Sequence, residues 1–219
     1  MNYFAHALHC LDDPYQCAGV ATPDWLAIFK PRVRCRSRHA EPFLEASDSN
    51  VAALAQGIVR HHADDGWFHE TAAFAQLSVD FAGRIRRATR DTDGMRPSFV
   101  GHILVELLLD ATLIEDHPGA LDTYYESLAK VSPALVAKQV SEMSGQDAGN
   151  LETLIPKFIE TRFLEDYQDD ERLCYRLNQV MRRVGLNELP EEFAELLPAA
   201  REDVRKRQVE LLGRQSASI

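Results

Sequence analysis

The segment GIVRHHADDGWFH, from Gly57 to His69, holds three of the chain's eight histidines and two aspartates. If it is an α-helix, His61, Asp65 and His69 follow one another at intervals of four residues and share one face. Imidazole and carboxylate groups on one helix face are typical ligands of a divalent metal ion. Two alternatives stay open. The helix could end or kink at Gly66, because an Asp-Gly pair often ends a helix, or the segment could be a polar helix end whose surface histidines bind no metal.

A second polar stripe lies in the segment from Pro97 to Ile114. This segment is apolar nearly all round, which predicts a buried central helix. His102, Glu106 and Asp110 are its strongly polar side chains, and their spacing of four puts them on one face. A buried carboxylate needs a cationic partner, because its desolvation costs several kcal/mol.

Two kinds of partner are consistent with this buried stripe. Salt bridges to arginines such as Arg60 or Arg84 would make the stripe purely structural. A metal ion held jointly with the face of His61 and Asp65 is the interpretation we favour, because both stripes repeat a histidine followed by an acid four residues later. The sequence therefore predicts one metal centre to which several segments contribute.

Two further residues of metal-ligand type lie near the start of the chain. His6 is embedded in a largely apolar pattern that predicts a short helix over residues 2–11. A threonine-proline pair directly before Asp24 is typical of a helix start, and it would place this aspartate in the first turn of a helix running to about Phe29. An aspartate there favours the helix dipole, and it could equally offer its carboxylate to a metal ion.

Arginines occur where they could contact a phosphate group. The segment from Lys30 to Ala46 has no hydrophobic period and predicts a loop, and alternating arginines within it include Arg34 and Arg36. Arg182 lies in a predicted helix of the C-terminal half. The alternatives are a solvated charged loop in the first case and pairing with nearby acids in the second.

The remaining pattern predicts an all-α, single-domain multi-helix bundle. The 219 residues suit one domain, with a metal-site half over 1–115 and a helical C-terminal half over 116–219. No alternation typical of β-strands persists. Further helices are predicted at residues 118–130, 133–144, 151–167, 170–184 and 191–212.

Composition limits the classes of function. The net charge of −10 argues against general affinity for nucleic acid or anionic membranes. No uncharged apolar run of about 18 residues and no basic leader occur, so we expect a cytoplasmic protein without a membrane span. The four cysteines show no CxxC spacing, which argues against a thiolate zinc cluster. The oligomeric state has no signal in the sequence.

Several motifs of the N-terminal half resemble the acyl carrier protein phosphodiesterase family, helical metal-dependent hydrolases similar to HD-domain phosphohydrolases. The opening MNYFAH is similar to that family's MNFLAH start, which aligns His6. Gly19 and Asp24 match its GN-x-x-x-D segment, although Val20 replaces the asparagine.

The two helical stripes carry the rest of this resemblance. GIVRHHADD is similar to the family's G-I-x-x-H-x-x-x-D helix at His61 and Asp65, and His69 stands where the family usually has an aspartate. Glu106 and Asp110 match its L-L-D-x-x-x-D segment, with glutamate for the first aspartate. A weaker similarity links these histidines to zinc-dependent phospholipase C-like proteins.

The resemblance implies an HD-like all-helical fold and hydrolysis of a phosphodiester, which in the family is protein-linked, assisted by one or two ions of Mn, Zn, Fe or Mg. The family's substrate is the phosphopantetheine link of holo acyl carrier protein, and the basic loop around Arg34 is the candidate surface for that acidic partner. A metal-bound water would be the nucleophile, and Glu106 or Asp110 would take its proton. Arg34, Arg36 and Arg182 are weaker candidates for the substrate phosphate. The expected metal ligands are His6, Asp24, His61, Asp65, His69 and His102.

Two alternatives to this hydrolase stay open. The protein could be a non-catalytic helical interaction protein whose polar stripes are buried ion pairs. It could also be a degenerate family member that binds a metal or ligand without turnover.

Overall fold

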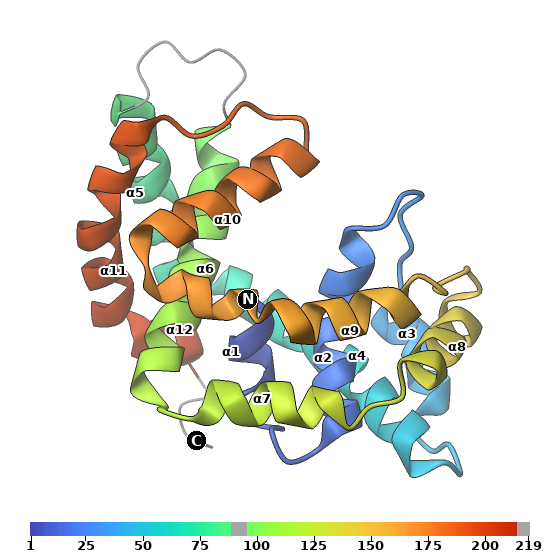
Figure 1. The fold of residues 1–219 in the computed structure, drawn as a ribbon. Coiled ribbons are helices and arrows are strands. Elements are labelled where there is room, and N and C mark those ends of the chain that lie inside the picture. The colour runs from blue at the N-terminus through green and yellow to red at the C-terminus, as the bar shows by residue number, and fades with distance from the viewer. Residues whose placement is uncertain (89–95, 214–219) are drawn as a thin grey trace. The chain divides into compact units, whose positions relative to one another are not determined.

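The computed structural model describes residues 1–88 and 96–213, and within these ranges the regular secondary structure consists of helices (Figure 1). This confirms the predicted all-α class. The chain packs as two compact units, each assembled from separate segments. Unit 1 contains Met1, Trp67–Asp116 and the chain from Phe163 onward, and unit 2 contains Asn2–Gly66 and His117–Arg162. Each unit therefore combines residues from both predicted halves, and the single-domain organisation stays a prediction.

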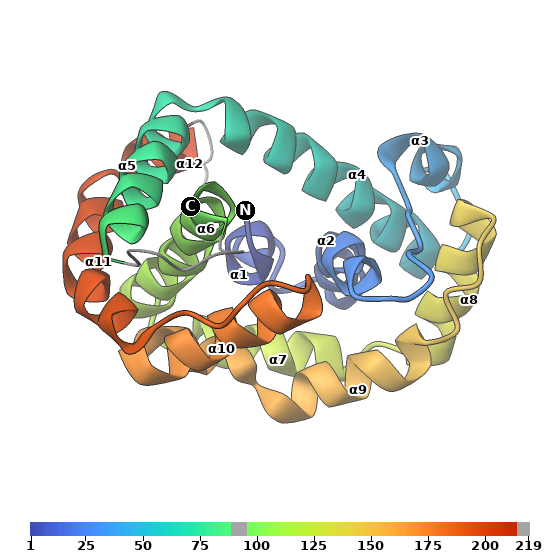
Figure 2. The ribbon, with the colours of Figure 1, turned by 90° about the horizontal axis from the view of Figure 1, so that it is seen from above.

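Unit 2 is organised around helix α2, which packs against α1, α7 and α9 (Figure 2). Its core is aromatic: Trp25 of α2 meets Phe158 edge to face, with ring centroids 5.4 Å apart, and Tyr124 meets the same phenylalanine at 6.4 Å. Trp25 and Tyr124 are fully buried, and such rings contribute a large share of the hydrophobic stabilisation. The helical segments are α1 (Tyr3–Ala7), α2 (Pro14–Ala27), α3 (Ser37–Ala40), the 3-10 helix η1 (Glu41–Phe43), most of α4 (Ser49–Glu70), α7 (Ala120–Ala129), α8 (Pro133–Ser144) and α9 (Leu151–Thr161).

Gly19 of α2 and Gly57 of α4 allow these two helices to cross with their backbones in contact. A Cβ atom at Gly19 would lie 2.4 Å from the carbonyl oxygen of Leu54 and 2.8 Å from the Cα of Gly57. A Cβ atom at Gly57 would meet the α2 backbone equally closely. Because these distances are well inside van der Waals contact, only glycine fits at the crossing. The crossing brings Val20, which follows Gly19, beside His61, one turn beyond Gly57.

Helix α2 begins earlier than the sequence indicated. Asp13 is its N-cap, with a side-chain carboxylate that accepts hydrogen bonds from the N–H groups of Tyr15 and Gln16 at 3.1 and 3.0 Å. The predicted start at the threonine-proline pair is wrong, because Pro23 lies inside the helix. An interior proline costs about 3 kcal/mol, and the buried side chains of this last turn, Trp25 above all, offset that cost. Asp24 consequently lies near the C-terminal end of α2.

Helix α4 runs without interruption through Gly66, so the predicted helix end at this residue does not occur. His61, Asp65 and His69 belong to one continuous helix, as the favoured interpretation requires. The next helix begins only after Thr71, whose hydroxyl accepts a hydrogen bond from the N–H of Phe74 at 3.2 Å. A second difference concerns the predicted loop, because α3 and η1 lie within residues 30–46.

Unit 1 is organised around α6, which packs against α5, α11 and η2 (Figure 1). By length and composition α6 is the one helix among the described residues that could cross a membrane, but 67% of its apolar window is buried in the structure. Burial of Val105, Leu108 and Leu109 makes it the core helix that the apolar pattern predicted. The other helical segments are the end of α4, α5 (Ala72–Ala88), α6 itself (Pro97–Asp116), η2 (Phe163–Gln168), α10 (Asp170–Arg183), η3 (Glu191–Leu196), α11 (Leu197–Lys206) and α12 (Gln208–Leu212).

Candidate metal centre

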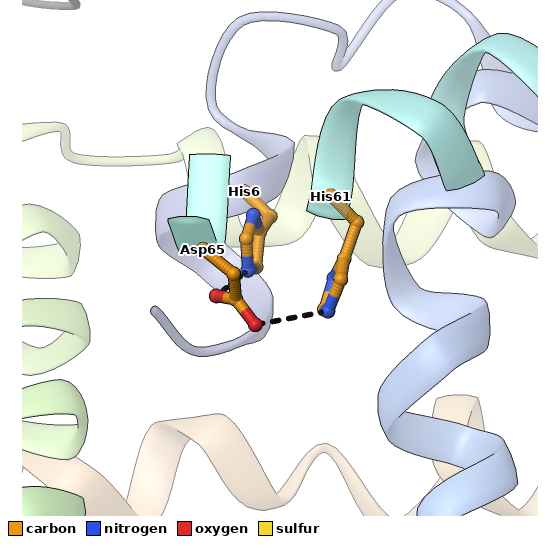
Figure 3. Close-up of side chains that lie close together, drawn as sticks. All are labelled: His6, His61 and Asp65. Atoms are coloured by element: carbon orange, nitrogen blue, oxygen red, sulfur yellow. Dashed lines mark ion pairs between the residues drawn. The ribbon is translucent and has the colours of Figure 1, made fainter. Parts of the chain in front are cut away.

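Three of the predicted metal ligands meet inside unit 2 (Figure 3). His6 comes from α1, and His61 and Asp65 come from successive turns of α4. One potential ligand atom from each lies within 4.8 Å of the others. Nε2 of His6 lies 3.2 Å from Oδ1 of Asp65, and Nε2 of His61 lies 3.4 Å from Oδ2 of the same carboxylate. Ligand atoms about 2.0–2.2 Å from a tetrahedral metal ion are separated by about 3.3–3.6 Å, which is close to these two distances.

His6 provides an independent test of whether this group fits a metal ion. The residue is fully buried, and neither of its ring nitrogens has a hydrogen-bond partner of good geometry among the described residues. Leaving a buried polar group unsatisfied costs about 1–3 kcal/mol. Coordination through one nitrogen would relieve part of that cost. His6 stacks on His61 with ring centroids 4.1 Å apart, which holds both imidazoles beside Asp65.

His61 is oriented by the backbone of α2. Its Nδ1 lies 2.7 Å from the carbonyl oxygen of Val20, and a hydrogen bond donated there turns Nε2 toward Asp65. Metal-binding histidines are commonly oriented by such an outer hydrogen bond. Burial on its own would lower the pKa of His61, but Asp24 and Asp65 outweigh burial and raise it. Metal binding at this imidazole would therefore compete with its protonation.

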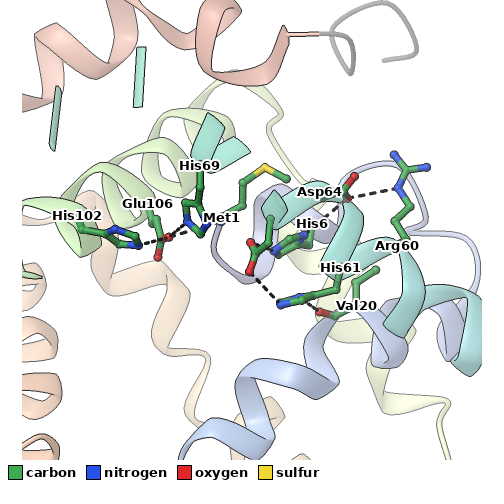
Figure 4. A network of polar contacts seen from close by, with 10 residues as sticks. Met1, His6, Val20, Arg60, His61, Asp64, His69, His102 and Glu106 are labelled. Atoms are coloured by element: carbon green, nitrogen blue, oxygen red, sulfur yellow. Dashed lines mark hydrogen bonds and ion pairs between the residues drawn. The ribbon is translucent and has the colours of Figure 1, made fainter. Parts of the chain in front are cut away.

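Asp64 is a functional candidate that the sequence analysis missed (Figure 4). Its Oδ2 lies 3.6 Å from Nδ1 of His6 and 3.3 Å from Nε of Arg60. Burial alone would raise the pKa of Asp64, but the neighbouring His6 and Arg60 lower it, so the carboxylate is ionised. Asp64 thus faces Nδ1 of His6, whereas Asp65 faces Nε2 of the same ring. The spacing of Arg60 and Asp64, four residues apart on one helix, was the signal that could have identified this pair.

Asp24 lies close to this group without being part of it. Its Oδ2 is buried and has no hydrogen-bond partner among the described residues. Burial raises the pKa of Asp24, and the nearby His61 and His6 offset this only in part. Burial would also raise the pKa of Asp65, but there the adjacent histidines outweigh it and lower the pKa below its usual range. The two carboxylates thus differ in proton affinity, which is typical of acid and base pairs in active sites.

A pocket of about 280 Å³ is lined by these residues and by the arginine-containing segment over residues 32–36. Residues that line it include Asp24, His61 and Asp65, together with Arg34 and Arg36, which were weak phosphate-binding candidates. The segment is anchored at two points: the Arg34 N–H donates to the Gln146 side chain at 2.9 Å, and Nε2 of His62 lies 2.8 Å from the Cys35 carbonyl oxygen. The loop therefore presents arginines on the wall of the pocket that contains the potential metal ligands.

The other predicted site residues lie in unit 1. His69, His102 and Glu106 form a second group whose potential ligand atoms lie within 4.8 Å of one another. Asp110 is fully buried in α6 and belongs to neither group. Arg182 pairs with Glu188 at 2.9 Å, which is the alternative arrangement considered for it. Because the two groups lie in different units, a single centre that combines the six expected ligands with Glu106 and Asp110 stays a prediction.

The arginines considered as partners of the α6 stripe are engaged elsewhere. Arg60 pairs with Asp64, and Arg84 pairs with Asp203 at 2.6 Å. The contacts of Glu106 include the imidazoles of His69 and His102. The cationic partner that burial of this glutamate requires is the Met1 amino group, 3.5 Å from the same carboxylate, and the two imidazoles add polar contacts.

Comparison of this chain with protein-family models, with curated proteins and with solved structures finds no match. The resemblance to acyl carrier protein phosphodiesterases consequently depends on the motifs themselves.

Proposed function

We propose that unit 2 contains the active centre of a metal-dependent hydrolase that cleaves phosphodiesters. The observation that carries the proposal is the buried His6, whose ring nitrogens have no hydrogen-bond partner of good geometry among the described residues and which faces Asp65 at 3.2 Å. The pocket beside this group is also lined by arginines. A cation site next to guanidinium groups suits a substrate that carries a phosphoryl group.

In this proposal His6, His61 and Asp65 hold one divalent ion. The Val20 carbonyl orients His61, and Asp64 orients His6. Two imidazoles and one carboxylate favour zinc, manganese or iron over magnesium, which prefers oxygen ligands. An ion bound there would lower the pKa of a coordinated water and polarise a phosphoryl oxygen.

The chain's own residues supply the proton transfer and the charge neutralisation. Asp24 takes the proton of the attacking water as the bond from phosphorus to the leaving oxygen breaks, and it returns that proton to the leaving alkoxide. Burial raises the pKa of Asp24 and makes it a stronger base than an ordinary aspartate. This role was given to Glu106 or Asp110 by the sequence hypothesis, and Asp24 replaces them here because it lines the same pocket as His61 and Asp65. Arg34 and Arg36 neutralise the charge that develops on the phosphoryl oxygens.

The substrate class in this proposal is a phosphodiester with one exposed ester arm. The 280 Å³ pocket is at the lower end of the size range of small-molecule sites, so a phosphoryl group and a short attached chain would fill it. Phosphopantetheine on an acyl carrier protein meets this description, and its acidic carrier would face the exposed arginines of the loop.

The test combines metal analysis with a chemical assay. Tag-free protein is analysed for bound metal and then assayed with bis(p-nitrophenyl) phosphate and with holo acyl carrier protein, with and without added Mn²⁺ or Zn²⁺. We expect metal-dependent hydrolysis by the wild type and its loss in His61→Ala and Asp65→Ala. His117→Ala serves as the control, because His117 belongs to neither group.

The non-catalytic interaction protein is the rival, and the distances from Asp64 and Asp65 to His6 are compatible with ion pairing alone. Under that interpretation neither metal binds and neither substrate is hydrolysed, while His61→Ala only loses stability. Metal binding without hydrolysis of either phosphodiester would instead identify a binding protein, and it would contradict the hydrolase.

A further inference from the structure

We propose that unit 1 carries a second metal site, formed by His69, His102 and Glu106 and independent of the centre in unit 2. His69 lies at the end of α4, and the other two residues are one turn apart on α6. Nε2 of His69 lies 2.9 Å from Oε1 of Glu106, and Nε2 of His102 lies 3.1 Å from the same oxygen (Figure 4). Three ligand atoms from two helices thus converge on one point.

The distances within this group, which are those of a hydrogen bond and an ion pair, are also compatible with metal coordination. Donor atoms about 2.0–2.2 Å from a metal ion are about 2.8–3.5 Å apart in octahedral or tetrahedral geometry. The two nitrogen-to-oxygen distances fall in this interval. The exposed fractions of the His69 and His102 side chains are 34% and 42%, so an ion has a route from solvent and room for water ligands.

Aromatic rings hold the two imidazoles in this arrangement. Phe74 of α5 packs against His69 and His102 with ring centroids 4.8 Å away in each case, edge to face for His102. Phe74 itself is 95% shielded from solvent. Gly101 makes this possible, because a Cβ atom there would lie 2.8 Å from the Ser78 carbonyl oxygen, so α5 and α6 cross closely beside His102. The rings are thus positioned before any ion arrives, which lowers the entropic cost of binding.

The donor set indicates the kind of ion. Two imidazole nitrogens and one carboxylate, with open positions left for water, suit Zn²⁺ and Co²⁺ and do not suit Mg²⁺ or Ca²⁺. The amino group of Met1 lies 3.5 Å from the same Glu106 oxygen and competes with the ion for it. Bound zinc would join the end of α4 to α6 within unit 1 and would stabilise their packing.

The experiment is a titration of metal-free protein with ZnCl₂, followed by calorimetry, and with CoCl₂, followed by visible absorption. The first site is removed in every sample with His61→Ala, so that only the unit 1 group is measured. We expect this variant to bind about one equivalent of Zn²⁺, and His61→Ala combined with His102→Ala or with Glu106→Gln to bind none. His61→Ala combined with His117→Ala is the control and should still bind about one equivalent. Circular dichroism checks the helical content of each variant.

Equal binding by the His61→Ala protein with and without His102→Ala would overturn the proposal, and so would a His61→Ala protein that binds no zinc. The outcome is separable from that of the proposed hydrolase centre. If wild type and His61→Ala bind the same single equivalent, and His102→Ala removes it, the unit 1 site stands and the unit 2 centre fails.

Discussion

The two groups of potential metal ligands use the same residue types in different surroundings. His6, His61 and Asp65 are set between helices of unit 2, where His6 is fully buried and the adjoining pocket is lined by arginines. His69 and His102 are partly exposed and lie against Phe74, while Glu106 between them is largely buried. The arginine-lined surroundings of the unit 2 group suit a reaction on an anionic substrate, whereas the aromatic surroundings of the unit 1 group suit the binding of a metal ion alone. Ligand type alone therefore does not determine chemistry, because the neighbouring charge and the degree of burial decide what a bound ion can do.

Both groups lie beside a helix crossing that glycine permits. Gly57 lies one turn before His61, and Gly101 directly precedes His102. In each case a Cβ atom would lie less than 3 Å from backbone of the neighbouring helix. The crossings fix α4 against α2 and α6 against α5, so each of them positions one of the two helices that carry a group's ligands.

The largest expected effect separates the two groups by activity. His61→Ala should lower hydrolysis of bis(p-nitrophenyl) phosphate by at least about 10³-fold, because the metal-bound nucleophile is lost. His102→Ala should leave the rate within about twofold, because its group is not assigned to the reaction. Initial rates at saturating metal measure both. Equal losses in the two variants would remove the functional distinction between the groups.

The next effect concerns stability. Gly57→Ala should destabilise the protein by about 3 kcal/mol, because the new methyl group overlaps the α2 backbone. Gly66→Ala lies in the same helix with nothing within 4 Å of its Cβ position, and it should be neutral or stabilising by up to about 1 kcal/mol. Urea unfolding measures both. Similar values for the two variants would show that the crossing is not tightly packed.

A smaller effect tests the outer carboxylate of the unit 2 group. Asp64→Asn should weaken metal binding about 10–100-fold, because the Asp64 carboxylate beside Nδ1 positions His6. High metal concentration should restore the rate, which a loss of folding would not allow. The exposed Asp12→Asn is the control. Unchanged affinity in the Asp64 variant would show that His6 needs no positioning residue.

The smallest effect concerns the arginines of the pocket. Arg34→Gln and Arg36→Gln should each raise KM about 10-fold, because one charge-assisted contact to the phosphoryl group is lost. The metal content should not change. Arg38→Gln belongs to the same segment but contacts His39, so its KM should match the wild type. A raised KM in all three variants would indicate general electrostatic attraction.

Much of the fold followed from local pattern. The helical class, the buried α6 and the starts of α6 and α8 at Pro97 and Pro133 were predictable, because hydrophobic period and helix-start signals act within one or two turns. At three places a local sequence signal predicted a different structure, and tertiary packing overrode that signal. Pro23 was tolerated inside α2, α4 continued through Gly66, and part of the predicted loop over residues 30–46 is helical.

The sequence by itself determined which residues have the chemistry of metal ligands and which of them share a helix face, since a four-residue interval fixes direction on any α-helix. Only the tertiary structure decided that His6 joins His61 and Asp65, that His69 joins His102 and Glu106, and that the arginine loop lines the pocket beside Asp24. These are contacts between residues distant along the chain. They depend on glycine crossings and aromatic packing, which a linear pattern does not encode.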